Sequence, residues 1–218
     1  MKRTILVVGM AALALTACSS KKNANEKNFT AAIQQQLEKS SADLCIPFTS
    51  SRDVPLNSWD MKQLQPFEAA GLISGTEVEI NDPMALPNPY ATTPAPKLKI
   101  ERYTLTEAGK KFYHEMDVSN PVRIVYATQN HFKRGYLCYG KIAVDKVTKW
   151  TEPTQSDNSQ TAQVSYLYKI DNLADWAKKP EIQQVEPTLR SMLEGVSKTE
   201  LTQAVVLTNL GWEAVSSK

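Results

Sequence analysis

Hydrophobic residues are concentrated at the start of the chain and are then replaced by polar ones. Two basic residues precede an apolar run over residues 5–15, and positions 19–27 are polar except for Ala24. A helix needs about 20 apolar residues to cross a bilayer, so this run is too short for a stable span. It has the layout of an export signal that is removed. We therefore predict a signal peptide over residues 1–17 and a flexible, lipidated tether over residues 18–28.

The next segment carries an apolar residue at every fourth position. Phe29, Ile33 and Leu37 recur with polar residues between them, and Asn28 is a suitable N-cap. This spacing places the apolar side chains on one face of a helix. We therefore predict an amphipathic helix that ends before Cys45.

Residues that start or stop helices divide the following part of the chain into short elements. Ser58 can cap a helical turn, Pro66 suits the first turn of a second short helix, and Gly71 can end it. Thr106 can cap a later helix. The remaining predicted elements are two strands, the Pro-rich loop between them and that later helix, over residues 77–80, 98–105, 81–96 and 107–116.

Alternation of apolar and polar residues marks the second half of the chain. Val164, Tyr166 and Tyr168 alternate with polar neighbours, which indicates an antiparallel strand with one buried face. The apolar run over residues 204–207 favours a central strand. The predicted strands cover residues 122–128, 135–150, 162–170 and 201–210, and the predicted helices cover residues 172–178 and 180–194.

Two short motifs flank the first pair of predicted strands. Gly-Leu-Ile at residues 71–73 follows a predicted helix, and Tyr-x-Leu-Thr-x-x-Gly at residues 103–109 opens another. This arrangement resembles part of a winged-helix module, and the resemblance implies a two-stranded wing. The helix that would read DNA departs from that family, because it carries Asp60 and Glu68 against a single lysine and contains Pro66. We therefore expect the shape of the module without binding of nucleic acid.

These elements predict an α+β fold. A helical N-terminal half, with a small winged-helix-like unit, would be followed by an antiparallel sheet packed against short helices. The corresponding domains are residues 29–120 and residues 121–218.

Four residues at the predicted cleavage site carry a second resemblance. Leu15-Thr16-Ala17-Cys18 resembles the lipobox of bacterial lipoproteins in all four positions. The resemblance implies cleavage before Cys18, a diacylglyceryl group on its thiol and an acyl chain on its amine, which together anchor the chain in a membrane. In Gram-negative members, Asp after the cysteine favours inner-membrane retention. Ser19 stands there instead, so the resemblance implies the outer membrane, facing the periplasm. The alternative is an ordinary secreted protein cut after Ala17.

Charge and cysteine content add two expectations. The net charge of +2 falls to zero when Lys2 and Arg3 leave with the signal peptide, which argues against a nucleic-acid partner. Cys45 and Cys138 are an even pair with apolar neighbours, so export to an oxidising compartment predicts a disulfide between them. Two separate buried thiols are the alternative.

Candidate catalytic residues are few. His114 lacks the second histidine of a His-Glu-x-x-His helix, and there is no Cys-x-x-Cys pair or Gly-rich phosphate loop, so we predict no metal and no cofactor. Residues 71–75 fit a helix end better than a Gly-x-Ser-x-Gly nucleophile turn. Asp171 and Asp175 fit a solvated first turn of a helix. Seven aromatic residues could line a binding face or form the core: Tyr136, Tyr139, Trp150, Tyr166, Tyr168, Trp176 and Trp212.

The sequence leads to one functional hypothesis and one alternative. We expect a non-enzymatic interaction module, tethered to the membrane, that binds another protein or component of the envelope through its sheet and aromatic surface. The alternative is an envelope hydrolase whose site is assembled only in the fold.

Overall fold

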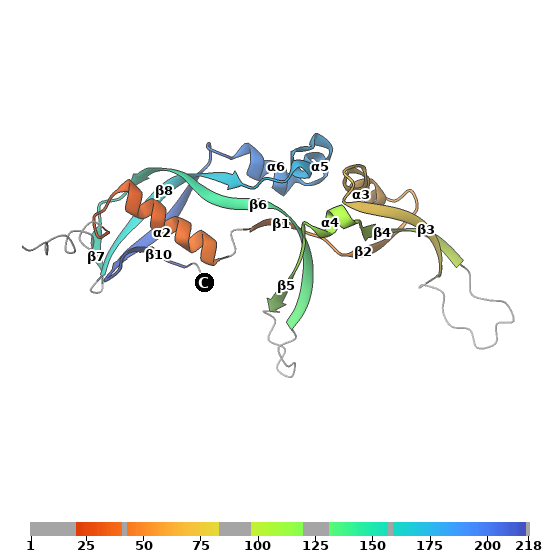
Figure 1. Cartoon of the computed structure of the whole chain (residues 1–218), viewed down its shortest axis with the longest axis horizontal. Coiled ribbons are helices and arrows are strands. Elements are labelled where there is room, and N and C mark those ends of the chain that lie inside the picture. The colour runs from red at the N-terminus through yellow and green to blue at the C-terminus, as the bar shows by residue number, and fades with distance from the viewer. Residues whose placement is uncertain (1–20, 41–42, 83–96, 120–130, 157–158, 217–218) are drawn as a thin grey trace, which may run out of the picture. The chain divides into compact units, whose positions relative to one another are not determined.

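The computed structural model describes residues 21–40, 43–82, 97–119, 131–156 and 159–216 (Figure 1). Within these ranges the chain forms two compact units. The first unit contains residues 21–40, 142–169 and 195–216, and the second contains residues 43–141 and 170–194. This division differs from the predicted domains 29–120 and 121–218. Strands β6 (His131–Trp150) and β8 (Ser159–Asp171) each contribute residues to both units.

A single helix, α2 (Glu26–Lys39), packs on the sheet of the first unit. It begins after Asn25, whose side chain accepts a hydrogen bond from the Asn28 N–H at 3.0 Å. Phe29 and Ile33 are buried one turn apart, as expected for one face of an amphipathic helix. The predicted helix is confirmed, but its cap is Asn25 and not Asn28.

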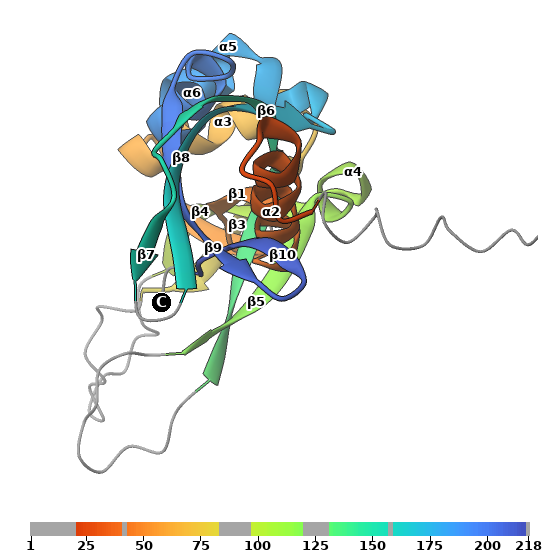
Figure 2. The same ribbon diagram turned by 90° about the vertical axis from the view of Figure 1, so that its left-hand side faces the viewer.

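Helix α2 lies alongside β9 (Glu200–Thr208) and β10 (Gly211–Ala214) (Figure 2). In this unit the strands follow the order β6-β8-β9-β10, and β7 (Thr154–Ser156) pairs with β8. Val164, Tyr166 and Tyr168 are buried at alternate positions of β8, as predicted. The predicted strand 201–210 ends at Thr208, and β10, which was not predicted, lies beside it.

Aromatic side chains form the centre of the first unit. The ring of Phe29 on α2 lies 5.4 Å from that of Trp150 and 5.0 Å from that of Trp212, both edge-on. Phe29 has no exposed surface. Edge-to-face aromatic pairs contribute about 0.5–1.5 kcal/mol beyond the burial of their area. Phe29 therefore holds the helix to the sheet together with Ala32 and Ile33, which are also buried.

The second unit contains a three-stranded antiparallel sheet, in the order β2 (Ser51–Pro55), β4 (Lys97–Leu105) and β3 (Ile73–Asn81). The predicted strands 77–80 and 98–105 lie within β3 and β4 and pair with each other. The predicted loop 81–96 and strand 122–128 fall largely or wholly outside the described residues.

One helix, α3 (Trp59–Ala69), replaces the two short helices that Pro66 suggested. Its cap is Ser58, which accepts from the Met61 N–H at 3.1 Å, and Gly71 follows its end with a φ of +76°. Leu64 and Phe67, on either side of Pro66, are both buried. Their packing offsets the hydrogen bond that a proline cannot donate, so the helix continues.

Strands β1 (Asp43–Pro47) and β5 (Tyr113–Ser119) both pair antiparallel with β6. The predicted helix 107–116 is wrong, because α4 (Glu107–Lys110) is a single turn and β5 follows it. The spacing of four between Phe112 and Met116 fits one helical turn and also two repeats of a strand. Pairing with β6 decides between them.

Three short helices complete the second unit: η1 (Asp175–Lys178), α5 (Pro180–Val185) and α6 (Pro187–Glu194). The predicted helix 180–194 is therefore broken, since Pro187 disfavours a helical conformation at Glu186 and has no N–H to donate. The largest buried members of the unit's core are Leu64, Phe67, Leu72, Ile73, Tyr103, Leu137, Tyr139, Trp176, Ile182 and Leu189.

The predicted α+β class with a helical N-terminal half is wrong, because strands account for 49% of the structure and helices for 29%. Strands β1 to β5 all lie in the half that was expected to be helical. β3 and β4 pair as the winged-helix resemblance implied, but β2 joins them and only one helical turn follows. Short strands that end in proline, such as β1 and β2, carry little alternation by which to recognise them.

Candidate functional site

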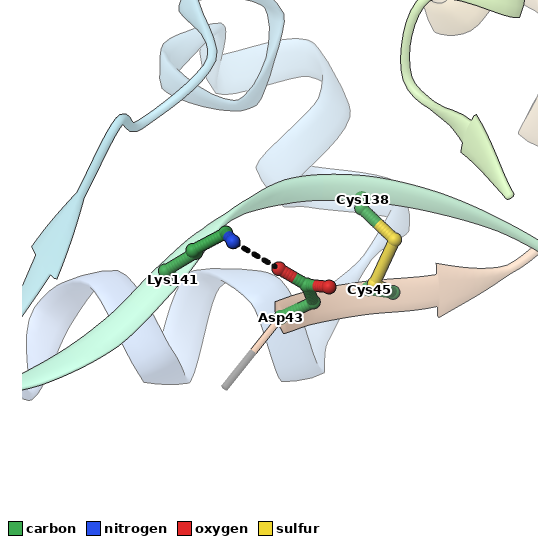
Figure 3. Close-up of a disulfide and its surroundings, with 4 residues drawn as sticks. All are labelled: Asp43, Cys45, Cys138 and Lys141. Atoms are coloured by element: carbon green, nitrogen blue, oxygen red, sulfur yellow. Dashed lines mark ion pairs between the residues drawn. A yellow bond between two sulfur atoms is a disulfide. The ribbon is translucent and has the colours of Figure 1, made fainter. Parts of the chain in front are cut away.

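Two of the three predicted site residues lie in the second unit and are bonded to each other. Cys45 on β1 and Cys138 on β6 are directly opposed, with Cα atoms 3.9 Å apart and a bond between their sulfurs (Figure 3). On the same strand pair, Lys141 Nζ lies 3.5 Å from a carboxylate oxygen of Asp43. The predicted disulfide is confirmed. The third residue, Cys18, lies outside the described residues.

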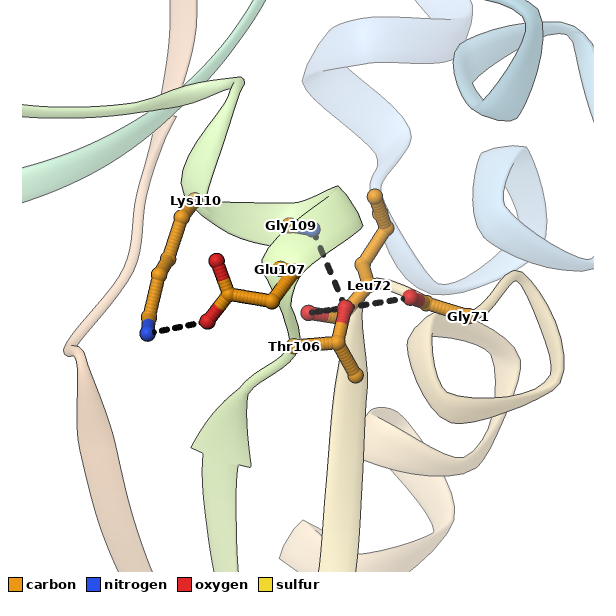
Figure 4. A network of polar contacts seen from close by, with 6 residues as sticks. All are labelled: Gly71, Leu72, Thr106, Glu107, Gly109 and Lys110. Atoms are coloured by element: carbon orange, nitrogen blue, oxygen red, sulfur yellow. Dashed lines mark hydrogen bonds and ion pairs between the residues drawn. The ribbon is translucent and has the colours of Figure 1, made fainter.

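Thr106 joins the end of α3 to the start of α4 (Figure 4). Its hydroxyl donates to the Gly71 carbonyl at 2.6 Å and accepts from the Gly109 N–H at 3.0 Å, as a helix N-cap does. Its own N–H donates to the Leu72 carbonyl at 3.0 Å. A Cβ atom on Gly109 would collide with that same carbonyl. The predicted cap is confirmed, and the network fixes the fold of the second unit.

Other candidate residues from the sequence lie at helix ends or in strands. Residues 71 and 72 follow the end of α3, as predicted, whereas β3 begins at Ile73, earlier than the predicted strand, and the Gly75 N–H donates to Glu68 Oε1 at 2.8 Å. Lys178 donates to Asp175 at 2.7 Å, and this hydrogen bond and charge lower the pKa of Asp175, which is an exposed first-turn residue as predicted. His114 lies on strand β5, where a helix had been expected.

Most of the seven aromatic residues lie in the core. Tyr139, Tyr166, Tyr168, Trp176 and Trp212 are all buried. Trp150 keeps 40% of its surface exposed, while its ring contacts Phe29. The interpretation of these residues as core is therefore confirmed for five of the seven, and an aromatic binding surface stays a prediction. The rings of Trp150 and Trp212 pack against Phe29 of α2, and the ring of Tyr139 packs against Trp176 of η1.

The ion pairs of the described residues are exposed, and each joins two side chains of the same unit. Arg102 donates twice to Asp53, at 2.7 Å each, and lowers the pKa of its carboxyl. Lys149 and Thr148 both donate to Glu200 and lower its pKa in the same way. Burial raises the pKa of four groups, of which two are on β8: Tyr103, Tyr166, Tyr168 and Glu186. Within the described ranges, no three His, Cys, Asp or Glu side chains lie together as metal ligands.

A cleft of about 460 Å³ in the second unit is lined by Phe48, Arg52, Asp53 and Arg134, among others. Its charges are engaged by neighbours, since Arg52 pairs with Asp60 at 3.0 Å and Asp53 pairs with Arg102. This pairing leaves the cleft without a strong preference for a charged ligand.

A groove of about 530 Å³ in the first unit has a different composition. It lies between the N-terminal end of α2 and the turn from β9 to β10, and it is lined by lysine and amide side chains together with Leu210 and Trp212. Leu210 keeps 74% of its surface exposed, the largest fraction of any large apolar side chain in the described part of the chain. An exposed leucine beside a set of lysines is typical of an interaction surface.

The turn that presents Leu210 is held by hydrogen bonds. The Leu210 N–H donates to the Thr208 hydroxyl at 3.1 Å, and that hydroxyl donates to the Gly211 carbonyl at 2.9 Å. Gly211 adopts a φ of +129°, which side chains rarely tolerate. The leucine is therefore displayed on a turn with a fixed backbone.

The chain at the other wall of the groove is part of the fold. Trp212 Nε1 donates to the Lys22 carbonyl at 3.1 Å, and Gly211 packs against the backbone of Lys21. Residues 21–28 were predicted to belong to the flexible tether. They instead belong to the first unit, because the buried indole of Trp212 needs an acceptor and Lys22 supplies one.

Comparisons with known protein families, with curated proteins and with solved structures found no match to this chain. Among the described residues, none of the helices is both long enough and apolar enough to span a membrane. The sequence did not point to the groove, because its walls come from opposite ends of the chain. The only available signal was Asn-Leu-Gly at residues 209–211, a turn sequence with an apolar residue in it.

Proposed function

We propose that this protein is an envelope lipoprotein, anchored through Cys18 to the periplasmic face of the bacterial outer membrane, which acts as a non-enzymatic binding module. The observation that carries the proposal is the position of Lys21, the first residue that the structure describes. Lys21 stands three residues after the lipobox-like cysteine and already packs on Gly211. The anchor is thus joined almost directly to a folded unit.

The disulfide supports export. A bond between Cys45 and Cys138 persists in an oxidising compartment and is rare in the cytosol of most organisms. An exported chain with a cysteine at the cleavage site is the substrate that lipidation requires.

The contacts of helix α3 bear on the kind of partner that the protein binds. The acidic residues of this helix are engaged within the second unit, since Asp60 pairs with Arg52 and Glu68 accepts from Gly75. Both acidic residues lie on α3, the helix that the winged-helix resemblance would place against DNA. We propose a protein or envelope component as the partner, and no nucleic acid.

The test is the substitution Cys18→Ala in cells. Removal of the acylated thiol is expected to leave an unprocessed precursor or to release the chain from washed membranes. Fractionation and the mass of the mature N-terminal peptide measure the result. Recovery of the variant in membranes at normal size and amount would overturn the proposal.

Ser19→Asp is the matched control. It keeps Cys18, so acylation should persist, while the lipoprotein resemblance implies a shift of the chain from outer-membrane to inner-membrane fractions. A chain that stays in the outer membrane would contradict the sorting part of the proposal and leave the anchor intact.

A further inference from the structure

The N-terminal end of the first unit carries an excess of positive charge. Lys21, Lys22 and Lys27 are all exposed there, and the acidic residues beside them are Glu26 and Asp145, which line a hollow together with Lys27. Lys21 and Lys27 line the same groove as Leu210. A fixed leucine surrounded by lysines combines the two features that bind proteins to anionic lipid surfaces.

The length of chain between anchor and fold limits where this surface can lie. Lys21 is three positions after Cys18, and this length of chain, fully extended, spans at most about 11 Å. The acylated cysteine sits at the level of the headgroups, a layer about 5–8 Å thick on each side of the hydrocarbon core. Lys21 therefore cannot lie more than a short distance beyond the headgroups.

We propose that the surface formed by Lys21, Lys22, Lys27 and Leu210 docks the first unit onto the anionic headgroups of the membrane that holds its anchor. The lysines contact lipid phosphates, and Leu210 enters the headgroup layer. The proposal rests on the lipid anchor proposed above. Docking would hold the first unit in one orientation on the membrane, with the N-terminal end of α2 toward the lipid.

Two matched positions distinguish this surface from the rest of the unit. Lys39 is an exposed lysine at the opposite end of α2, twelve residues and thus about 18 Å from Lys27 along the helix. Val215 is an apolar residue with 44% of its surface exposed, just after β10 and about 16 Å along the strand from Leu210. Both lie on the same unit without belonging to the docking surface.

The test uses the lipidated full-length mature chain in vesicles that contain phosphatidylglycerol. A nitroxide is attached at Leu210→Cys or at Val215→Cys, and its relaxation by a nickel chelate on the lipid headgroups is compared with that by a chelate in water. We expect the label at position 210 to respond mainly to the lipid-bound nickel and the label at position 215 to respond mainly to the aqueous nickel. Equal responses at the two positions would overturn the proposal.

Charge reversal gives a second, independent readout on the non-lipidated mature chain with Cys18→Ser. Binding to the same vesicles should weaken by about five-fold for each lysine lost from the docking surface, and it should weaken with salt. Lys21→Glu with Lys22→Glu is expected to act in this way, whereas Lys39→Glu should change binding little. A loss as large for Lys39→Glu would contradict the proposal.

The outcomes separate the two proposals. Mass spectrometry of the mature N-terminal peptide first establishes whether the chain carries acyl groups. A mature chain without acyl groups would overturn the proposed function. An acylated chain whose position 210 faces water would overturn only the docking surface. Protection of position 210 that rises with protein concentration would identify a second copy of the chain as the occupant, and would also overturn membrane docking.

Discussion

The two units hold their helices and strands together by different interactions. The second unit contains the disulfide, the Thr106 network and a bidentate ion pair between Arg102 and Asp53. The first unit contains no cysteine among its described residues and depends on one helix whose Phe29 meets two tryptophans. Covalent and polar fixation suits a unit made of many short strands, while a single helix on a sheet is stabilised by apolar burial.

This difference predicts that each unit can be destabilised alone. The four tryptophans are divided equally, with Trp150 and Trp212 in the first unit and Trp59 and Trp176 in the second. Hydrogen exchange followed by mass spectrometry can report on both units in one sample, because their peptides are distinct.

The largest effect is expected from removal of the disulfide. Cys45→Ser with Cys138→Ser opens a loop whose ends are 93 residues apart, for which the chain-entropy treatment gives about 5 kcal/mol as an upper value. All residues of that loop lie in the second unit. Amides of β3 and β4 should lose protection against exchange while those of β9 retain it. An equal loss of protection in β9 would show that the units do not unfold separately.

The next effect concerns the first unit. Phe29→Ala removes a fully buried ring, and a substitution of this kind costs about 4 kcal/mol. Protection should fall in α2, β9 and β10 and persist in β3 and β4, which is the reverse of the disulfide variant. Phe29→Leu, as the control, should retain most of the stability. A change in unfolding free energy below about 1 kcal/mol for Phe29→Ala would contradict the role given to this ring.

A smaller effect is expected from Thr106→Val. It keeps the shape of the side chain and removes the hydroxyl that caps α4, which should cost about 1–2 kcal/mol. The Gly109 N–H should exchange faster, while exchange in α2 is unchanged. Thr106→Ser keeps the hydroxyl and serves as the control. Undisturbed exchange at Gly109 in the valine variant would rule out the capping bond.

Local signals in the sequence were sufficient for some elements. Phe29 and Ile33 predicted α2, alternation around Tyr166 predicted β8, and Gly71 and Thr106 marked a helix end and a helix start correctly. In each case a periodicity or a capping preference belongs to the element itself, so no distant residue is needed to recognise it.

Features that depend on distant residues were not predictable in this way. Residues 113–119 form a strand because β6 supplies a partner, and Pro66 stays inside a helix because its neighbours are buried in a core. The same limit applies to the groove, since Lys22 and Trp212 are hydrogen bonded across 190 residues of sequence. The disulfide was an exception, because the assignment of Cys18 to lipidation leaves two cysteines, which allow only one intramolecular pairing.

The hydrogen bond between Trp212 and Lys22 has a consequence for biogenesis. If the chain is exported N-terminus first, as proposed, α2 is delivered early and β6 brings Trp150 to Phe29, but β9 and β10, with Trp212, arrive only with residues 195–216. A helix of this length is marginal in water without a partner. The second unit has all its segments before that point, so we expect it to be completed first. The first unit would then complete its folding last. A chain cut short before β9 would leave Phe29 more exposed, and quality-control proteases could recognise it.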